Sequence, residues 1–470
     1  MRKFILLLIL MGVNFGFATE FFSVSLNENE KLEGSMSNNF SNNESSHFII
    51  IRNTQSSKYI VRSFLINNEK KVIQLEDAIF NEMPNILSQH KNENTLTFTN
   101  YSKRNKTLFI IDLDTKTGKK SFDKIENIEN PDLIFTESNF SIAINLDPSG
   151  KSITVQKIES SALKTNKTIY VPEELIKEFK TIVKNTPDAI NQNEFVKNGS
   201  INPFKAYCIN ENIFFTDNSN REFSNVFQLN SNSQNPITKY KFKTNFDKEL
   251  KDINSYVVDN TFVVLGSGKE DFSVNAFNLD NQQFINKISF LNDLKENFNS
   301  NELDIFLKEA KKSILKSTIT INKTLNNNLK VRIDKVNKNT YQYNYNWWFH
   351  TWFMQQQQIM MQHMMIHNQI RAGGFGPSDK FDAYFDFILS LKDDKYQSLE
   401  FVVNPTDFKI ITSSNEETIF KNVDKEALLS PYEENNNFKE FSCAFTDTEY
   451  HLIYFNKKSK KVHIEVKNIN

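Results

Sequence analysis

The chain has 470 residues, of which 39% are hydrophobic, and its 56 Lys and Arg against 57 Asp and Glu give a formal net charge of -1. Such a nearly neutral chain lacks the basic face with which proteins bind nucleic acid, so we expect no nucleic-acid partner. Eleven glycines are few, but 43 phenylalanines and 14 tyrosines provide bulky side chains for a sizeable core.

The first eighteen residues have the layout of a secretory signal peptide. Two basic residues precede an apolar run from Phe4 to Met11, and small residues follow at Gly16 and Ala18. The run is shorter than the roughly 20 residues that a membrane-spanning helix needs, although an uncleaved anchor is the alternative. We therefore predict a signal peptide at 1–18, export to the periplasm, the cell surface or the exterior, and no transmembrane span in the mature chain.

Beyond this segment, short stretches of alternating apolar and polar residues recur in units. In 132–171, for example, alternating strands flank a turn at Asp147–Gly150, whose proline and glycine favour chain reversal. Within 255–290, four short strands follow one another. The predicted units lie at 47–75, 95–125, 132–171, 207–242, 255–290, 398–414 and 441–466.

The spacing of these units predicts the fold. Corresponding strand ends at Ile66, Leu113 and Ile158 are 47 and 45 residues apart. Four-stranded meanders that repeat at about 40 to 50 residues are typical of a β-propeller. We therefore predict a mainly β protein, a β-propeller of about seven blades with a partly helical insertion. Two β-sandwich domains plus a helical segment are the alternative.

Two segments interrupt the repeat. Residues 172–185 carry apolar side chains at helical spacing after Pro172, which predicts a helix that covers one blade edge. A larger, partly helical insertion rich in Met, Gln, His and Trp begins with an amphipathic helix at 301–317. The predicted organisation is therefore β-meander blades 1–5 in 19–295, the insertion in 296–395 and the closing blades in 396–470.

The insertion contains 32 consecutive residues without a charged side chain, from 339 to 370. A solvated surface helix is mostly polar, so a helix here would be buried, self-associated or lying in a membrane interface. Insertions on repeating scaffolds often carry function. We therefore predict a contact surface for a partner protein or a membrane surface, with an unstructured loop as the alternative. Its anchors are Trp347, Trp348, Trp352 and Phe353.

The same segment contains a candidate metal site. Its His and Met side chains lie on adjoining faces of the expected helix, and such ligands suit Cu(I) or another soft ion. The candidate ligands are His350, Met360, His363, Met364 and His367. However, the stretch lacks the Glu that a zinc-protease helix places after its first His, and Met at helical spacing is more often adaptable core. We therefore expect no cofactor, with copper as the alternative.

Few other residues point to chemistry. Cys208 and Cys443 are a possible disulfide, although two separate buried thiols fit the sequence as well. His47 and His451 are isolated, so we predict surface or cross-strand residues rather than a catalytic base. The sequence contains no recognisable catalytic motif. We therefore expect an exported, non-catalytic binding or interaction protein, with periplasmic copper binding and an enzyme that uses the propeller channel as alternatives.

Overall fold

A computed structural model describes most of the chain that follows the predicted signal peptide. It covers residues 22–469 apart from 41–42, 193–198, 231–235, 245, 247–249, 269–271, 296–299, 311–314, 338–397, 412–415, 422, 424, 434 and 447. The chain divides into two compact units. Unit 1 consists of 1–128, 160–162 and 423–470, and unit 2 consists of 129–159 and 163–422.

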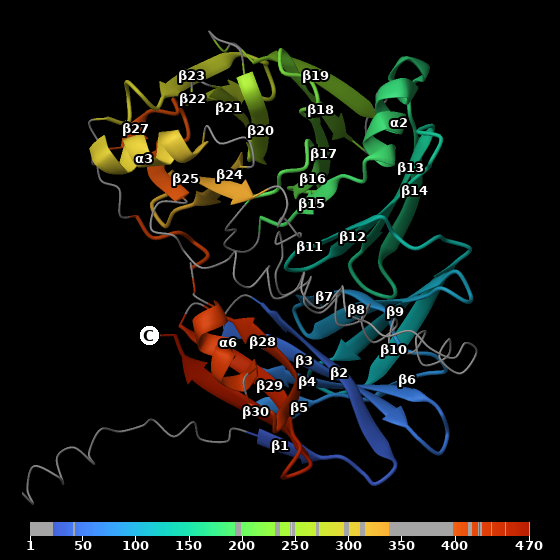
Figure 1. Ribbon diagram of the computed structural model, residues 1–470. Coiled ribbons are helices and arrows are strands. Elements are labelled where there is room, and N and C mark those ends of the chain that lie inside the picture. Colours follow the sequence, from blue (N-terminus) through green and yellow to red (C-terminus); the bar gives the residue numbers. More distant parts are fainter. Residues whose placement is uncertain are drawn as a thin grey trace, which may run out of the picture. The chain divides into compact units, whose positions relative to one another are not determined.

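Among its described residues, unit 1 contains three small antiparallel sheets and helix α6 (Lys425–Glu433) (Figure 1). The first sheet is β2 (Glu30–Asn39), β3 (Ser45–Asn53), β4 (Tyr59–Ile66) and β5 (Val72–Gln74), with β6 (Ala78–Phe80) also on β4. The second is β7 (Ile86–Asn92), β8 (Thr95–Ser102), β9 (Thr107–Asp114) and β10 (Lys120–Glu126). The third is β28 (Phe438–Phe445), β29 (Glu449–Asn456), β30 (Lys461–Asn468) and β1 (Phe22–Ser25).

The described part of unit 2 contains four more sheets. The first is formed by β11 (Leu133–Thr136), β12 (Ser141–Leu146), β13 (Ser152–Ile158) and β14 (Lys164–Tyr170). The second is formed by β15 (Asp188–Ile190), β16 (Phe204–Ile209), β17 (Asn212–Asp217), β18 (Phe223–Leu229) and β19 (Ile237–Lys243), and in it β15 is parallel to β16. The third is formed by β20 (Leu250–Val258), β21 (Thr261–Gly268), β22 (Phe272–Asn278) and β23 (Phe284–Ser289). The fourth is formed by β24 (Leu315–Lys323), β25 (Leu329–Asn337), β26 (Ser398–Val403) and β27 (Ile410–Ile411). Its helices are η2 (Glu173–Leu175), α2 (Ile176–Lys184) and α3 (Ser300–Ala310).

The prediction of a mainly β protein built from repeated small antiparallel sheets is confirmed. The predicted insertion at 296–395 needs correction, because its first part contains β24 and β25, which pair with each other and then with β26. Both segments alternate apolar and polar residues, a pattern that is typical of strands. The helix predicted at 301–317 instead ends at Ala310, and Leu315 already belongs to β24.

The sheet that contains both ends of the described chain is completed by its first strand. β1 pairs with β30 in antiparallel register, with Phe22 opposite Ile464 and Val24 opposite Val462. Phe22 and Val24 pack on a core that includes Phe64 and Ile464. Since β1 covers the free edge of β30, the chain closes this sheet with a segment from its other end.

The predicted helix at 172–185 is confirmed as η2 and α2. α2 is amphipathic, and its buried Phe179 makes edge-to-face ring contacts with Phe215 and Phe227, at centroid distances of 6.0 and 5.0 Å. Figure 1 shows α2 beside β13 and β14. α2 therefore covers the apolar faces of two neighbouring sheets.

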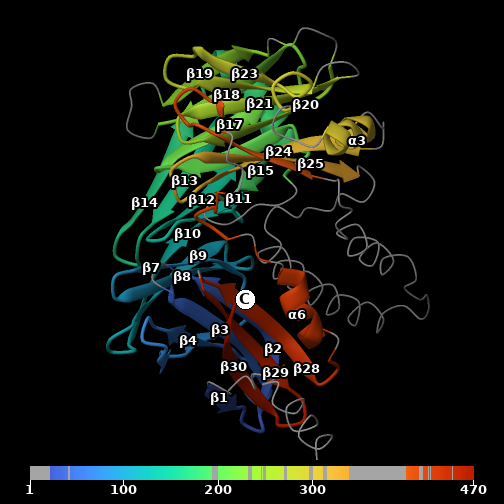
Figure 2. The ribbon, with the colours of Figure 1, turned by 90° about the vertical axis from the view of Figure 1, so that its left-hand side faces the viewer.

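Helix α6 lies beside β28 in unit 1 (Figure 2). Its Tyr432 ring stacks on Phe438 at a centroid distance of 5.7 Å, and its hydroxyl donates a hydrogen bond to Glu465 Oε2 at 3.0 Å. Among the described helices, none combines the length and the apolar character needed to cross a membrane.

Gly150 offers a test of the contact between α2 and the β12–β13 turn. Gly150 has a φ of +75°, and a Cβ atom there would lie 2.6 Å from the Lys180 backbone nitrogen. Gly118 has a similar φ of +71°, but the nearest atom to its Cβ would be 3.8 Å away. Both Ala variants carry the left-handed penalty of about 1–2 kcal/mol, whereas Gly150→Ala should lose about 1–3 kcal/mol more through the clash. Chemical denaturation measures both, and equal losses would contradict this account of the contact.

Candidate functional site

The predicted contact surface and copper site lie outside the described residues. This applies to Trp347, Trp348, Trp352 and Phe353, and to His350, Met360, His363, Met364 and His367. Both expectations stay predictions. The clearest described candidates are instead a pocket and a buried polar network, both in unit 1.

The possible disulfide is not formed, because neither Cys208 nor Cys443 is disulfide-bonded. Cys208 is buried on β16 in the core of unit 2, and burial raises the pKa of its thiol to about 12. Cys443 is buried on β28 in unit 1. Each cysteine therefore belongs to the interior of its own unit, as the alternative of two separate buried thiols expected.

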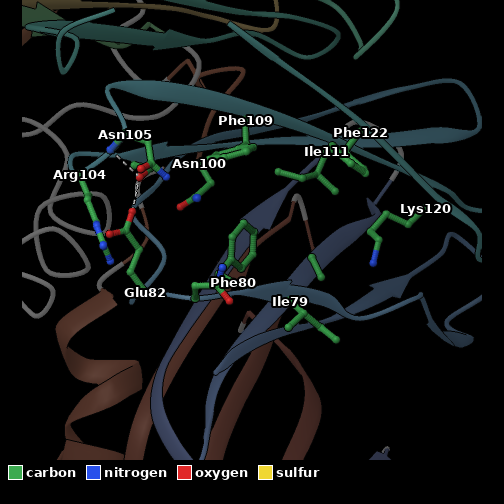
Figure 3. A pocket seen from close by; sticks show the side chains of 13 residues that line it. Ile79, Phe80, Glu82, Asn100, Arg104, Asn105, Phe109, Ile111, Lys120 and Phe122 are labelled. Carbon is green, nitrogen blue, oxygen red and sulfur yellow. Dashed lines mark hydrogen bonds between the residues drawn. The ribbon is translucent and has the colours of Figure 1, made fainter. Parts of the chain in front are cut away.

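The pocket lies between β6 and strands β8–β10 and has a volume of about 580 Å³ (Figure 3). β5 and β6 share one edge of β4, so the connector between them passes close to the β9–β10 hairpin. There the Glu76 backbone N–H donates to Gly118 O at 2.9 Å, and Lys120 Nζ donates to Asp77 O at 2.7 Å. These bonds hold β6 against the hairpin and fix one wall of the pocket.

One end of the pocket is apolar. Phe80, Phe109 and Ile111 line it, together with Ile79 and Phe122, whose exposed fractions are 59% and 67%. Large apolar side chains that remain exposed beside a cavity favour contact with a ligand or partner.

The other end of the pocket is polar, and Figure 3 shows Asn100 between it and the apolar side chains. Glu82 accepts a hydrogen bond from the Ser102 hydroxyl. Arg104 is exposed and has no ion pair or hydrogen bond in the described part of the chain. Asn100 is only 2% exposed, yet its Oδ1 atom has no hydrogen-bond partner. A buried amide oxygen left in this way costs about 1–3 kcal/mol.

The buried network joins the sheet of β2 and β3 to the sheet of β28 and β29. Ser45 Oγ lies 2.8 Å from His47 Nε2 and 2.6 Å from His451 Nδ1. On the His47 side, Nδ1 lies 2.7 Å from Ser37 Oγ, which is 2.7 Å from Ser442 Oγ. His47, His451 and Ser45 are fully buried. His47 is directly opposite Ser37, so the cross-strand alternative holds for it and the surface alternative is wrong.

The network continues from His451 to the surface. His451 Nε2 lies 3.1 Å from Glu449 Oε1, and Lys70 Nζ donates to Glu449 Oε2 at 2.6 Å. Burial raises the pKa of Glu449, but hydrogen bonds from Lys70 and His451 outweigh it, and the net shift is downward. Glu449 is therefore an ionised acceptor, held at its outer side by a half-exposed lysine.

Because Glu449 is ionised, it sets the direction of each hydrogen bond in this buried network. Since a carboxylate only accepts, His451 must donate from Nε2, which leaves Nδ1 to accept the Ser45 proton. Ser45 then accepts from His47 Nε2, so His47 Nδ1 accepts from Ser37. Burial lowers the pKa of both histidines, most strongly that of His47, where His451 adds to the effect. Both rings are therefore neutral, and one tautomer of each satisfies the network.

Ser45, His451 and Glu449 contain the residue types of a hydrolase triad, but they do not form an accessible site. The Ser45 hydroxyl is fully buried and shared by two imidazoles, so no substrate reaches it. The arrangement joins two sheets, and its role is structural. Sequence reasoning missed the network because its members come from residues about 400 positions apart.

Comparisons with known proteins do not identify a family for this chain. No protein-family model matches the sequence, and no curated protein is detectably similar to it. A Kluyveromyces lactis Hsv2 structure aligns over 93% of this chain and 98% of its own, at 9% identity and a TM-score of 0.31. A prolyl endopeptidase structure aligns over 93% of this chain and 50% of its own, at 8% identity and a TM-score of 0.35. This chain thus spans half of that protein, and scores this low show no shared function.

The two neutral histidines make the stability of unit 1 depend on pH. Below about pH 6.5 the unfolded chain binds protons that the folded His47 and His451 resist, so the free energy of unfolding falls as the pH falls toward their lowered pKa values. Each ring contributes at most about 1.4 kcal/mol per pH unit. Urea denaturation from pH 8 to 5 should show this slope.

The control is the double variant His47→Gln/His451→Gln. It should be less stable at pH 8, because hydrogen bonds are lost, but its slope between pH 6.5 and 5 should be flatter. A double variant with the slope of the wild type would contradict neutral histidines in the folded state.

Proposed function

We propose that the chain is a seven-bladed β-propeller that works as an exported, non-catalytic binding protein and takes its ligand in the unit 1 pocket. In this proposal each described sheet is one blade. Its strands follow in meander order, and the last blade takes its outer strand, β1, from the start of the chain. This order supports a propeller, in which radial repetition leaves only short, protected sheet edges.

The observation that carries the binding role is the unpartnered Asn100 oxygen in a pocket with an exposed apolar wall. Several buried polar atoms in the described residues have no hydrogen-bond partner, and among them Asn100 Oδ1 is the one whose residue lines the pocket. An acceptor left without a partner beside a cavity of this size is typical of a site whose hydrogen bond is completed by the ligand. The few convergent polar groups and the apolar lining support binding rather than group transfer.

The pocket should bind the fluorescent dye anilinonaphthalene sulfonate, because the aromatic rings of the dye can pack on the apolar wall. Phe122→Glu should reduce dye binding at least about fivefold, because it places a charge in the apolar end and removes ring contact worth about 1 kcal/mol or more. Leu325→Glu is the matched control, since Leu325 is 64% exposed in unit 2, far along the chain from the pocket residues. Fluorescence titration measures both variants, and equal binding by both would refute the pocket as the site.

Asn100→Leu tests whether the orphaned oxygen serves function at the expense of stability. Leucine has a similar size and no polar atom, so the variant should unfold at a higher free energy, by about 1–3 kcal/mol. Differential scanning calorimetry or urea denaturation measures the change. A destabilised variant would mean that the amide supports the fold and is not reserved for a ligand.

A further inference from the structure

We infer that the ligand of the unit 1 pocket is a short peptide segment that ends in a large apolar residue with a free carboxyl group. This inference rests on the proposed binding function and adds the class of ligand. It follows from which polar groups at the pocket are already satisfied and which are not.

The two cationic side chains at the pocket differ in whether they already have a partner within the protein. Lys120 lines one end, but its ammonium group donates to Asp77 O at 2.7 Å and forms an ion pair with Glu76 at 3.3 Å. Arg104, at the polar end, has no such partner among the described residues. An exposed guanidinium with five N–H donors binds a carboxylate in a two-pronged geometry. The free cation therefore favours a negative group on the ligand.

The acceptors at the same end require N–H donors. Asn100 Oδ1 has no partner, and Glu82 accepts the hydrogen bond of the Ser102 hydroxyl at Oε1. A fatty acid provides a carboxylate and an apolar body but no donor for Asn100. A peptide provides both, because a side-chain amide such as that of Asn100 pairs with the N–H and C=O of a peptide group.

The apolar end then takes the last side chain of the peptide. Figure 3 places Asn100 between the Glu82 and Arg104 end and the apolar side chains, which include Phe80 and Phe109. A peptide bonded to Asn100 would extend its carboxyl group toward Arg104 and its side chain toward these rings. A volume of about 580 Å³ is in the range for a ligand of a few residues.

The experiment measures fluorescence anisotropy of labelled tetrapeptides of the form Ala-Ala-Ala-X, with X as Phe, Leu or Asp, on the full mature chain. We expect Phe and Leu to bind and Asp to bind at least about tenfold more weakly, as the apolar wall requires. The Phe peptide with an amidated end should bind about threefold to fivefold more weakly at low ionic strength, because Arg104 is exposed. Decanoate should compete poorly.

Two variants assign these effects to residues. Arg104→Gln should remove the preference for the free carboxyl group, so that the free and amidated Phe peptides bind with equal affinity, and Lys103→Gln, which should keep the preference, controls for the loss of a neighbouring charge. Asn100→Leu should lower the affinity for both peptides by at least about tenfold.

The outcomes separate the two proposals. If decanoate competes as well as the Phe peptide and Asn100→Leu leaves peptide binding unchanged, the peptide inference is overturned and the pocket remains a binding site. If neither dye nor any peptide binds in a way that depends on Phe122, the proposed function fails as well.

Discussion

Each described sheet of this protein has an apolar face that must be buried, and the rest of the structure depends on that constraint. A sheet of four short strands gains stability only when its apolar face packs on another element. The abundant phenylalanine, isoleucine and leucine fill these faces, and α2 covers two sheets at once through Phe179. Strand ends buried between packed sheets must then satisfy their polar groups within the protein.

Unit 1 meets this requirement in the histidine network and leaves it unmet at several buried atoms, one of which belongs to the pocket. Between β3 and β29, seven side chains from Ser442 to Lys70 form a continuous set of hydrogen bonds with one consistent direction. At the pocket, Asn100 is as deeply buried but its oxygen has no partner. The same physical rule therefore accounts for the continuous hydrogen bonds of the network, and in the proposed function the open acceptor at the pocket is completed by a ligand.

The sequence predicts the local features of the fold and little of the site. Alternating residues identify most strands, and the apolar spacing after Pro172 identifies α2, because both signals lie within a few neighbouring residues. The residues of β24 and β25 also alternate between apolar and polar, but both strands lie beside the segment of unusual composition after residue 338, and the predicted insertion included them. The pocket needs Ile79, Asn100 and Phe122 from three different strands. Which side chains share a wall, and which oxygen lacks a donor, depends on packing that no local pattern contains.

The pairing of β1 with β30 has a consequence for how the chain reaches its native state. Unit 1 is assembled from both ends of the sequence, whereas unit 2 is nearly continuous from residue 129 to 422. During synthesis, unit 2 has all of its strands before β28–β30 exist. Phe22 and Val24 must wait, unpaired, until the last residues are made. Contacts between such distant positions form slowly, so the N-terminal strand is a segment that a chaperone or a neighbouring chain can capture before folding ends.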